Sequence, residues 1–130
     1  GDDAVYRAAF ERIVLPVLEA YAPELVLVSA GFDAAAADPL AQMELSDDAF
    51  AWMSSELCRV ADRSASGRMA LVLEGGYDLV ALESGLTHAM QGMLAPASSG
   101  APVAARAPSP APPDVDRAAR EAKKTWGVVG

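Results

Sequence analysis

Two short runs of apolar residues constrain the fold of this chain more than any other feature of its sequence. Residues 25–28 read LVLV and residues 69–73 read MALVL, without a polar side chain in either run. Apolar runs of this length are too short for helices, and the first is typical of a strand buried on both faces of a parallel sheet. We therefore expect strands at both positions.

Helical patterns flank both runs. Apolar residues recur at helical spacing in residues 2–21, where Pro16 is expected to kink or split the helix near Leu15. Ser46 and Asp78 are suited to cap two further helices. The helix that Asp78 caps is expected to bury a stripe of large side chains: Leu79, Leu82, Leu86, Met90 and Met93. The order helix, strand, helix, strand, helix predicts an α/β fold with a parallel sheet.

Composition divides the chain into three parts. Residues 1–95 carry the α/β pattern, residues 96–113 are rich in Ala, Pro and Ser and predict an extended linker, and residues 114–130 predict a terminal helix and tail. We expect Trp126 to dock this helix onto the body, because a large apolar ring is stabilised by burial. Two strands do not form a stable sheet alone, so we expect the chain to be a fragment of a longer protein.

The net charge and the cysteine content exclude several classes of function. The 130-residue chain has a formal net charge of −8, which argues against nucleic-acid binding because that needs a basic patch. The single cysteine, Cys58, excludes an internal disulfide and a cysteine-based zinc site, and it suits a reducing compartment. The sequence shows no signal peptide or long apolar span, so we expect a cytoplasmic protein without membrane contact.

Polar residues and glycines follow both apolar runs. Asp33 comes just after the first strand, and the second strand leads into Gly75, Gly76 and Tyr77. Parallel strands end at the same edge of a sheet, where ligands bind in α/β proteins, so Asp33 and Tyr77 are candidates for one site. A carboxylate can bind Zn²⁺, and a neutral tyrosine hydroxyl can donate a hydrogen bond to an oxyanion.

Each of these residues also has a structural interpretation. Asp33 can cap a turn or a helix, Tyr77 can be an ordinary half-buried tyrosine, and Gly75 and Gly76 can form an ordinary turn. The only histidine, His88, falls within a predicted helix and is interpreted as a helix-face residue. From the residues alone, the sequence predicts an α/β unit with a candidate acidic site.

Three ordered segments resemble the C-terminal third of the histone deacetylase family. They are LVSAGFDA at residues 27–34, DPL at 38–40 and LEGGY at 73–77. The LEGGY segment resembles that of the class II and bacterial branch of the family, which includes acetylpolyamine amidohydrolases. The resemblance implies an arginase-like, three-layer α/β fold with a parallel sheet. It also implies Zn²⁺-dependent hydrolysis of N-acetyl amides, in acetyl-lysine or acetylpolyamines, to free amine and acetate.

The resemblance also implies roles for individual residues. Asp33 would be a zinc ligand, and Tyr77 would polarise the acetyl carbonyl and stabilise the oxyanion of the tetrahedral intermediate. Leu40 would line the substrate tunnel, and Gly75 and Gly76 would lie along the channel for the acylated amine.

The sequence departs from the family in the motifs that it lacks. The paired histidines that supply the general base, and the Asp-x-His motif that supplies the other zinc ligands, are absent from residues 1–130. The chain alone is therefore expected to be inactive. A non-catalytic, deacetylase-like binding or scaffolding module is the main alternative, and a fragment of another α/β hydrolase is a third. The sequence leaves open whether the protein forms a homo-oligomer and which acylated substrate it uses.

Overall fold

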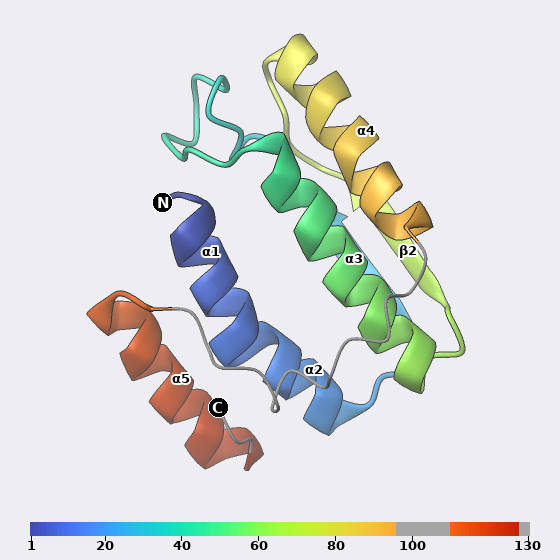
Figure 1. Cartoon of the computed structure of the whole chain (residues 1–130), viewed down its shortest axis with the longest axis vertical. Coiled ribbons are helices and arrows are strands. Elements are labelled where there is room, and N and C mark those ends of the chain that lie inside the picture. Colours follow the sequence, from blue (N-terminus) through green and yellow to red (C-terminus); the bar gives the residue numbers. More distant parts are fainter. Residues whose placement is uncertain (96–109, 128–130) are drawn as a thin grey trace.

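The computed structural model describes residues 1–95 and 110–127. Its elements in chain order are α1 (Asp3–Ala9), η1 (Phe10–Val14), α2 (Leu15–Tyr21), β1 (Val26–Ala30), α3 (Asp47–Ser64), β2 (Met69–Leu73), α4 (Leu79–Leu94) and α5 (Pro113–Trp126). In the view of Figure 1 the strands lie behind α3 and α4, while α5 lies beside the N-terminal helices. The predicted order of helices and strands is confirmed.

Most of the predicted linker, residues 96–109, lies outside the described residues, so the three-part division of the chain stays a prediction. Among the residues that are described, no helix combines the length and the apolar character needed to cross a membrane.

The first predicted helix forms as α1, η1 and α2 in one continuous run. It begins after Asp2, whose carboxylate accepts a hydrogen bond of 3.1 Å from the Val5 N–H. Pro16 lies in the first turn of α2, where its missing N–H is tolerated. Ahead of it, the Leu15 N–H donates to the Phe10 carbonyl, which is the spacing of a π-helix. The helix is not split near Leu15, but the predicted change in its regular pattern is found there as a π-helical turn.

The two strands pair in parallel, as predicted. Val26 lies opposite Met69 and Ala30 lies opposite Leu73, so both strands end at the same edge of the sheet. The inner face of the sheet packs on the N-terminal helices and α3 through one buried cluster. Its members are Leu15, Val26, Val60, Ala61 and Ala65, with Val28 and Met69 packed against them.

The expectation that the first strand is buried on both faces is wrong for the described residues. Val26 is 6% exposed on the inner face, whereas Leu27 on the outer face is 68% exposed. Val72 of β2 lies on the same outer face and is 56% exposed. The helices cover one face of this sheet, and no other described element shields the apolar side chains of the second.

Helices α3 and α4 pack closely through small residues. The buried residues of α4 are Ala81, Gly85, Ala89 and Gly92. A Cβ added at Gly92 would lie 2.1 Å from the carbonyl oxygen of Ala51, so α3 leaves no room there for a larger side chain. The predicted stripe of large residues is therefore wrong in part, because Leu79 and Met90 are 79% and 52% exposed. Leu82 and Leu86 pack against the core at the edge of the contact.

Helix α5 docks on the N-terminal helices, as predicted, but the Trp126 side chain, expected to be buried, stays 47% exposed. The Trp126 and Tyr21 rings meet edge to face with centroids 6.2 Å apart. Arg12 donates to Asp116 at 2.7 Å, which links η1 to the first turn of α5. An aromatic contact and an ion pair thus hold the terminal helix to the body.

Candidate active site

The two strand ends are joined by main-chain hydrogen bonds at the edge of the sheet. The Glu74 N–H donates to the Ala30 carbonyl at 3.0 Å, and the Phe32 N–H donates to the Gly75 carbonyl at 2.8 Å. These bonds continue the parallel ladder past β1 and β2 and bring the segment containing Asp33 next to the glycine pair. The predicted proximity of the two strand ends is confirmed.

The carboxylate of Asp33 lies against the main chain of two glycines. A Cβ added at Gly75 would lie 2.7 Å from Oδ1 and 2.9 Å from Cγ of Asp33, and one added at Gly31 would lie 2.8 Å from Oδ1. Cβ atoms do not approach oxygen so closely, so the position of the carboxylate requires the absence of a side chain at both residues. Within the described residues, Asp33 has no hydrogen bond or ion pair. Its oxygens are therefore available to a ligand.

The glycine pair then turns the chain toward α4. Gly76 has a φ of +137°, which residues with a Cβ rarely adopt, and a Cβ there would lie 3.0 Å from Leu82 Cδ1. Tyr77 follows directly, and its side chain is 61% exposed. Leu40, on the loop between β1 and α3, is 62% exposed. Both side chains are accessible to a substrate.

Asp38 connects these two exposed residues. Its Oδ1 accepts a hydrogen bond of 2.9 Å from the Leu40 N–H. Its Oδ2 accepts bonds of 2.7 Å from the Tyr77 N–H and 3.1 Å from the Asp78 N–H. Burial raises the pKa of Asp38, but the hydrogen bonds from Leu40, Tyr77 and Asp78 outweigh it, so the pKa lies below its usual value. The carboxylate therefore stays ionised and bonded at neutral pH.

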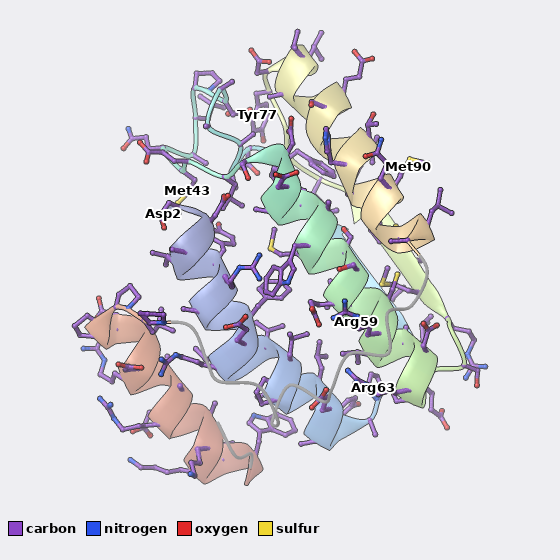
Figure 2. The ribbon with its side chains drawn as sticks, viewed as in Figure 1. Asp2, Met43, Arg59, Arg63, Tyr77 and Met90 are labelled. Atoms are coloured by element: carbon purple, nitrogen blue, oxygen red, sulfur yellow. The ribbon has the colours of Figure 1, made fainter. Side chains whose placement is uncertain are left out.

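The sequence does not predict this connection, since it singles out Asp38 only as part of the DPL segment at residues 38–40. The bond to Leu40 is local and typical of an Asp-Pro turn. The bonds to Tyr77 and Asp78 join segments far apart in the chain, and no local pattern indicates them. Figure 2 shows Tyr77 near this loop, at the opposite end of α3 from Arg63.

A cavity of about 270 Å³ lies on the inner side of β1 and is lined in part by Asp33. Most of its other side chains are apolar and come from the N-terminal helices, β1 and α3, among them Phe10, Val28 and Phe50. Electrostatic interactions are stronger beside apolar surface than in water. The attraction between Asp33 and a bound cation would therefore be stronger on this side than in bulk water.

Asp33 fits the role of one zinc ligand, because its carboxylate is accessible and unpartnered among the described residues. The same part of the chain contains no cluster of three His, Cys, Asp or Glu side chains that could hold a metal ion. A zinc site at Asp33 would therefore need ligands from beyond the described residues.

The surroundings of His88 and Cys58 indicate structural roles for both residues. His88 Nδ1 lies 2.9 Å from the Ser84 carbonyl of its own helix and 3.9 Å from Asp47 of α3. Burial and the nearby Asp62 carboxylate raise the pKa of the Cys58 thiol, which disfavours the reactive thiolate. The interpretation of His88 as a helix-face residue is confirmed, and Cys58 has no feature of a nucleophile.

Comparison with known sequences identifies several deacetylase relatives. The profile of the "Histone deacetylase domain" matches residues 1–93. The histone deacetylase-like amidohydrolase of Pseudomonas aeruginosa is 51% identical over 77 residues, 59% of this chain and 20% of that protein. The human polyamine deacetylase HDAC10 is 44% identical over 101 residues, 75% of this chain and 14% of that protein. The chain thus spans a fifth or less of these two relatives.

Two known structures share the fold. The crystal structure of the HDA15 HD domain matches with a TM-score of 0.76 and 27% identity, over 97% of this chain and 32% of that one. The structure of the histone deacetylase Clr3 matches with a TM-score of 0.72 and 32% identity, over 96% of this chain and 20% of that one. These likenesses confirm the predicted deacetylase-type α/β fold.

Proposed function

This chain belongs to the histone deacetylase family, and on that premise we propose that the whole protein catalyses zinc-dependent hydrolysis of N-acetyl amides. The products would be a free amine and acetate, and the substrate an acetylated lysine or an acetylpolyamine. The relatives support this class of reaction, since their names include a histone deacetylase-like amidohydrolase and a polyamine deacetylase.

The observation that carries the proposal is the unpartnered carboxylate of Asp33 at the end of a parallel strand. Gly31 and Gly75 leave it space, and within the described residues no other group binds its oxygens. A carboxylate without hydrogen bonds contributes little to the stability of the fold, but it is well suited to bind a metal ion. When bound, zinc would polarise the acetyl carbonyl and make hydroxide available at neutral pH.

Tyr77 is proposed to donate a hydrogen bond to the acetyl oxygen as negative charge develops on it. It lies two residues beyond Gly75, which contacts Asp33, and its exposed side chain is free to meet a substrate. A phenol hydroxyl can donate such a hydrogen bond. Leu40, Gly75 and Gly76 are proposed to line the path of the acylated side chain.

The general base and the remaining zinc ligands are proposed to come from beyond the described residues, since these offer no complete metal site. For the same reason we propose that the chain alone is inactive. The alternative is a deacetylase-like domain that binds partners without catalysis, and the two functions predict different metal contents for the whole protein.

The test uses the full-length protein, with zinc content and deacetylation of an acetyl-lysine peptide and an acetylated polyamine as readouts. We expect about one zinc per chain, in line with one catalytic site. Asp33→Asn should lose the metal, and Tyr77→Phe should keep it while the rate falls about 10²–10³-fold, as for loss of an oxyanion donor.

Matched substitutions elsewhere serve as controls. Asp48→Asn changes an exposed carboxylate at the start of α3, and Tyr21→Phe removes a hydroxyl near α5. Both should behave like the parent. A full-length protein without zinc, whose Asp33 and Tyr77 variants match the parent, would favour the binding module instead.

A further inference from the structure

The carboxylate of Asp38 restrains the main chain on both sides of the Tyr77 Cα. Its Oδ2 accepts the N–H of Tyr77 and the N–H of Asp78, which belong to the two peptide planes flanking that Cα atom. Both planes are therefore held by one atom. The Asp38 residue is only 6% exposed, so water competes poorly for these bonds.

The other restraints on Tyr77 are few. Its side chain is 61% exposed and gains little orientation from packing. On its N-terminal side, Gly76 has a positive φ and no Cβ, so the chain there is intrinsically free. On its C-terminal side, Asp78 caps α4 by accepting the Ala81 N–H at 2.8 Å. Asp38 is thus the described side chain that ties this segment to the rest of the site.

From these contacts we propose that Asp38 is a positioning residue, which orients the Tyr77 hydroxyl by fixing the Tyr77 main chain. The inference rests on the proposed function, in which that hydroxyl stabilises the oxyanion. The same carboxylate accepts the Leu40 N–H through Oδ1. It therefore also fixes the loop that carries Leu40 relative to Tyr77.

The position of the hydroxyl matters because it lies at the far end of a long side chain. A small rotation of the flanking peptides moves the oxygen much further than it moves the Cα. A misplacement of about 1 Å at a reacting group can cost about 10²-fold in rate. A carboxylate that never touches the substrate can therefore control the rate.

The experiment measures kcat, KM, zinc content and melting temperature for Asp38→Asn and Asp38→Ala in the full-length protein. An amide cannot accept hydrogen bonds at both ends, because its nitrogen is itself a donor. We expect kcat to fall about 10-fold to 10²-fold, by the misplacement argument above. Zinc content should stay close to that of the parent, because no metal ligand is removed, and KM should change less than kcat, because the Leu40 side chain itself is retained.

Repeating the substitution in the Tyr77→Phe variant separates an effect on the position of the hydroxyl from a general loss of stability. If Asp38 acts through the Tyr77 hydroxyl, Asp38→Asn should cost little further rate once Tyr77→Phe is in place. Asp47→Asn is the matched control, because Asp47 accepts a 2.5 Å hydrogen bond from Ser84 that joins α3 to α4. It should lower stability without lowering kcat.

Several outcomes would overturn the inference while the proposed function stands. They are an unchanged kcat, a loss of zinc, or an equal fold-loss with and without the Tyr77 hydroxyl. A parent without deacetylase activity, or a Tyr77→Phe variant as active as the parent, would overturn both the proposed function and this inference. If Asp38→Ala fails to fold, the isosteric Asn variant decides.

Discussion

The loop that follows β1 carries two aspartates, Asp33 and Asp38, and their carboxylates have opposite surroundings. Asp33 has no hydrogen bond or ion pair within the described residues, although it is confined between Gly31 and Gly75. Asp38 accepts three main-chain N–H groups and is almost fully buried. Residue type alone does not distinguish the two aspartates, but their hydrogen bonding does.

The difference indicates which carboxylate serves the fold and which is available for chemistry. Removing a hydrogen-bonded, buried carboxylate leaves its donors unsatisfied, which destabilises the protein. Removing an unpartnered one leaves nothing unsatisfied. We therefore expect Asp38 to contribute to stability and Asp33 to contribute to metal binding.

The largest effect is expected from Asp33→Asn in the full-length protein. Loss of a residue that only hydrogen-bonds to a metal ligand lowers metal affinity about 10–100-fold. Because Asp33 is proposed to bind the metal directly, its loss should lower zinc affinity by more than this. The melting temperature of the metal-free protein should stay unchanged. Metal titration and thermal denaturation of the metal-free protein measure the two quantities. A clear loss of metal-free stability would show that Asp33 is a structural residue like Asp38.

Gly75→Ala tests the contact that distinguishes Asp33. The new Cβ would lie 2.7 Å from Oδ1 and 2.9 Å from Cγ, so the carboxylate has to move. We expect zinc affinity about 10–100-fold below that of the parent, the usual cost of disturbing the surroundings of a ligand. Gly31→Ala approaches only Oδ1 within 3 Å, at 2.8 Å, and should cost less. Equal affinities in the parent and both variants would contradict this arrangement.

The geometry around Asp33 could be predicted because it depends on the sheet. Two apolar runs separated by a helix imply parallel strands, and parallel strands end together. The sequence therefore predicts that the segments containing Asp33 and Tyr77 meet at one edge of the sheet, whereas the close contact of Asp33 with Gly75 comes from the structure. The bonds from Asp38 to Tyr77 and Asp78 depend instead on how two loops meet in space, and neither loop carries a local sign of its partner.

Packing also decides which helix residues are buried. Leu79 and Met90 fit a helical stripe of large residues, yet the small residues next to them face α3, because the helices approach too closely for Leu or Met. Likewise, an apolar run predicts burial on both sides of a strand, but Leu27 is exposed because the described helices lie on the other side. Hydrophobicity alone indicates neither the distance between elements nor which face they cover.

A smaller effect, on stability alone, is expected from Gly92→Ala. The added Cβ would lie 2.1 Å from the Ala51 carbonyl oxygen, so α3 and α4 have to separate, at a typical cost of about 1–3 kcal/mol. Chemical denaturation measures this cost. Zinc affinity and kcat, assayed well below the melting temperature, should match the parent. Loss of kcat in this variant would mean that destabilisation alone accounts for the effect of Asp38→Asn.

The smallest expected effect is the pH dependence of the stability that Asp38 provides. Its pKa in the folded protein is below its usual value, because the hydrogen bonds from Leu40, Tyr77 and Asp78 outweigh the effect of burial. The contribution is therefore complete above the unfolded-state pKa of about 4 and is lost as pH falls through the folded-state value. The difference in melting temperature between the metal-free parent and Asp38→Asn should thus be constant near neutral pH and shrink below about pH 4. The Asp78 carboxylate lies on the same segment, so Asp78→Asn is the matched comparison. A difference that stays constant down to about pH 3 would show that the Asp38 charge does not stabilise the folded chain.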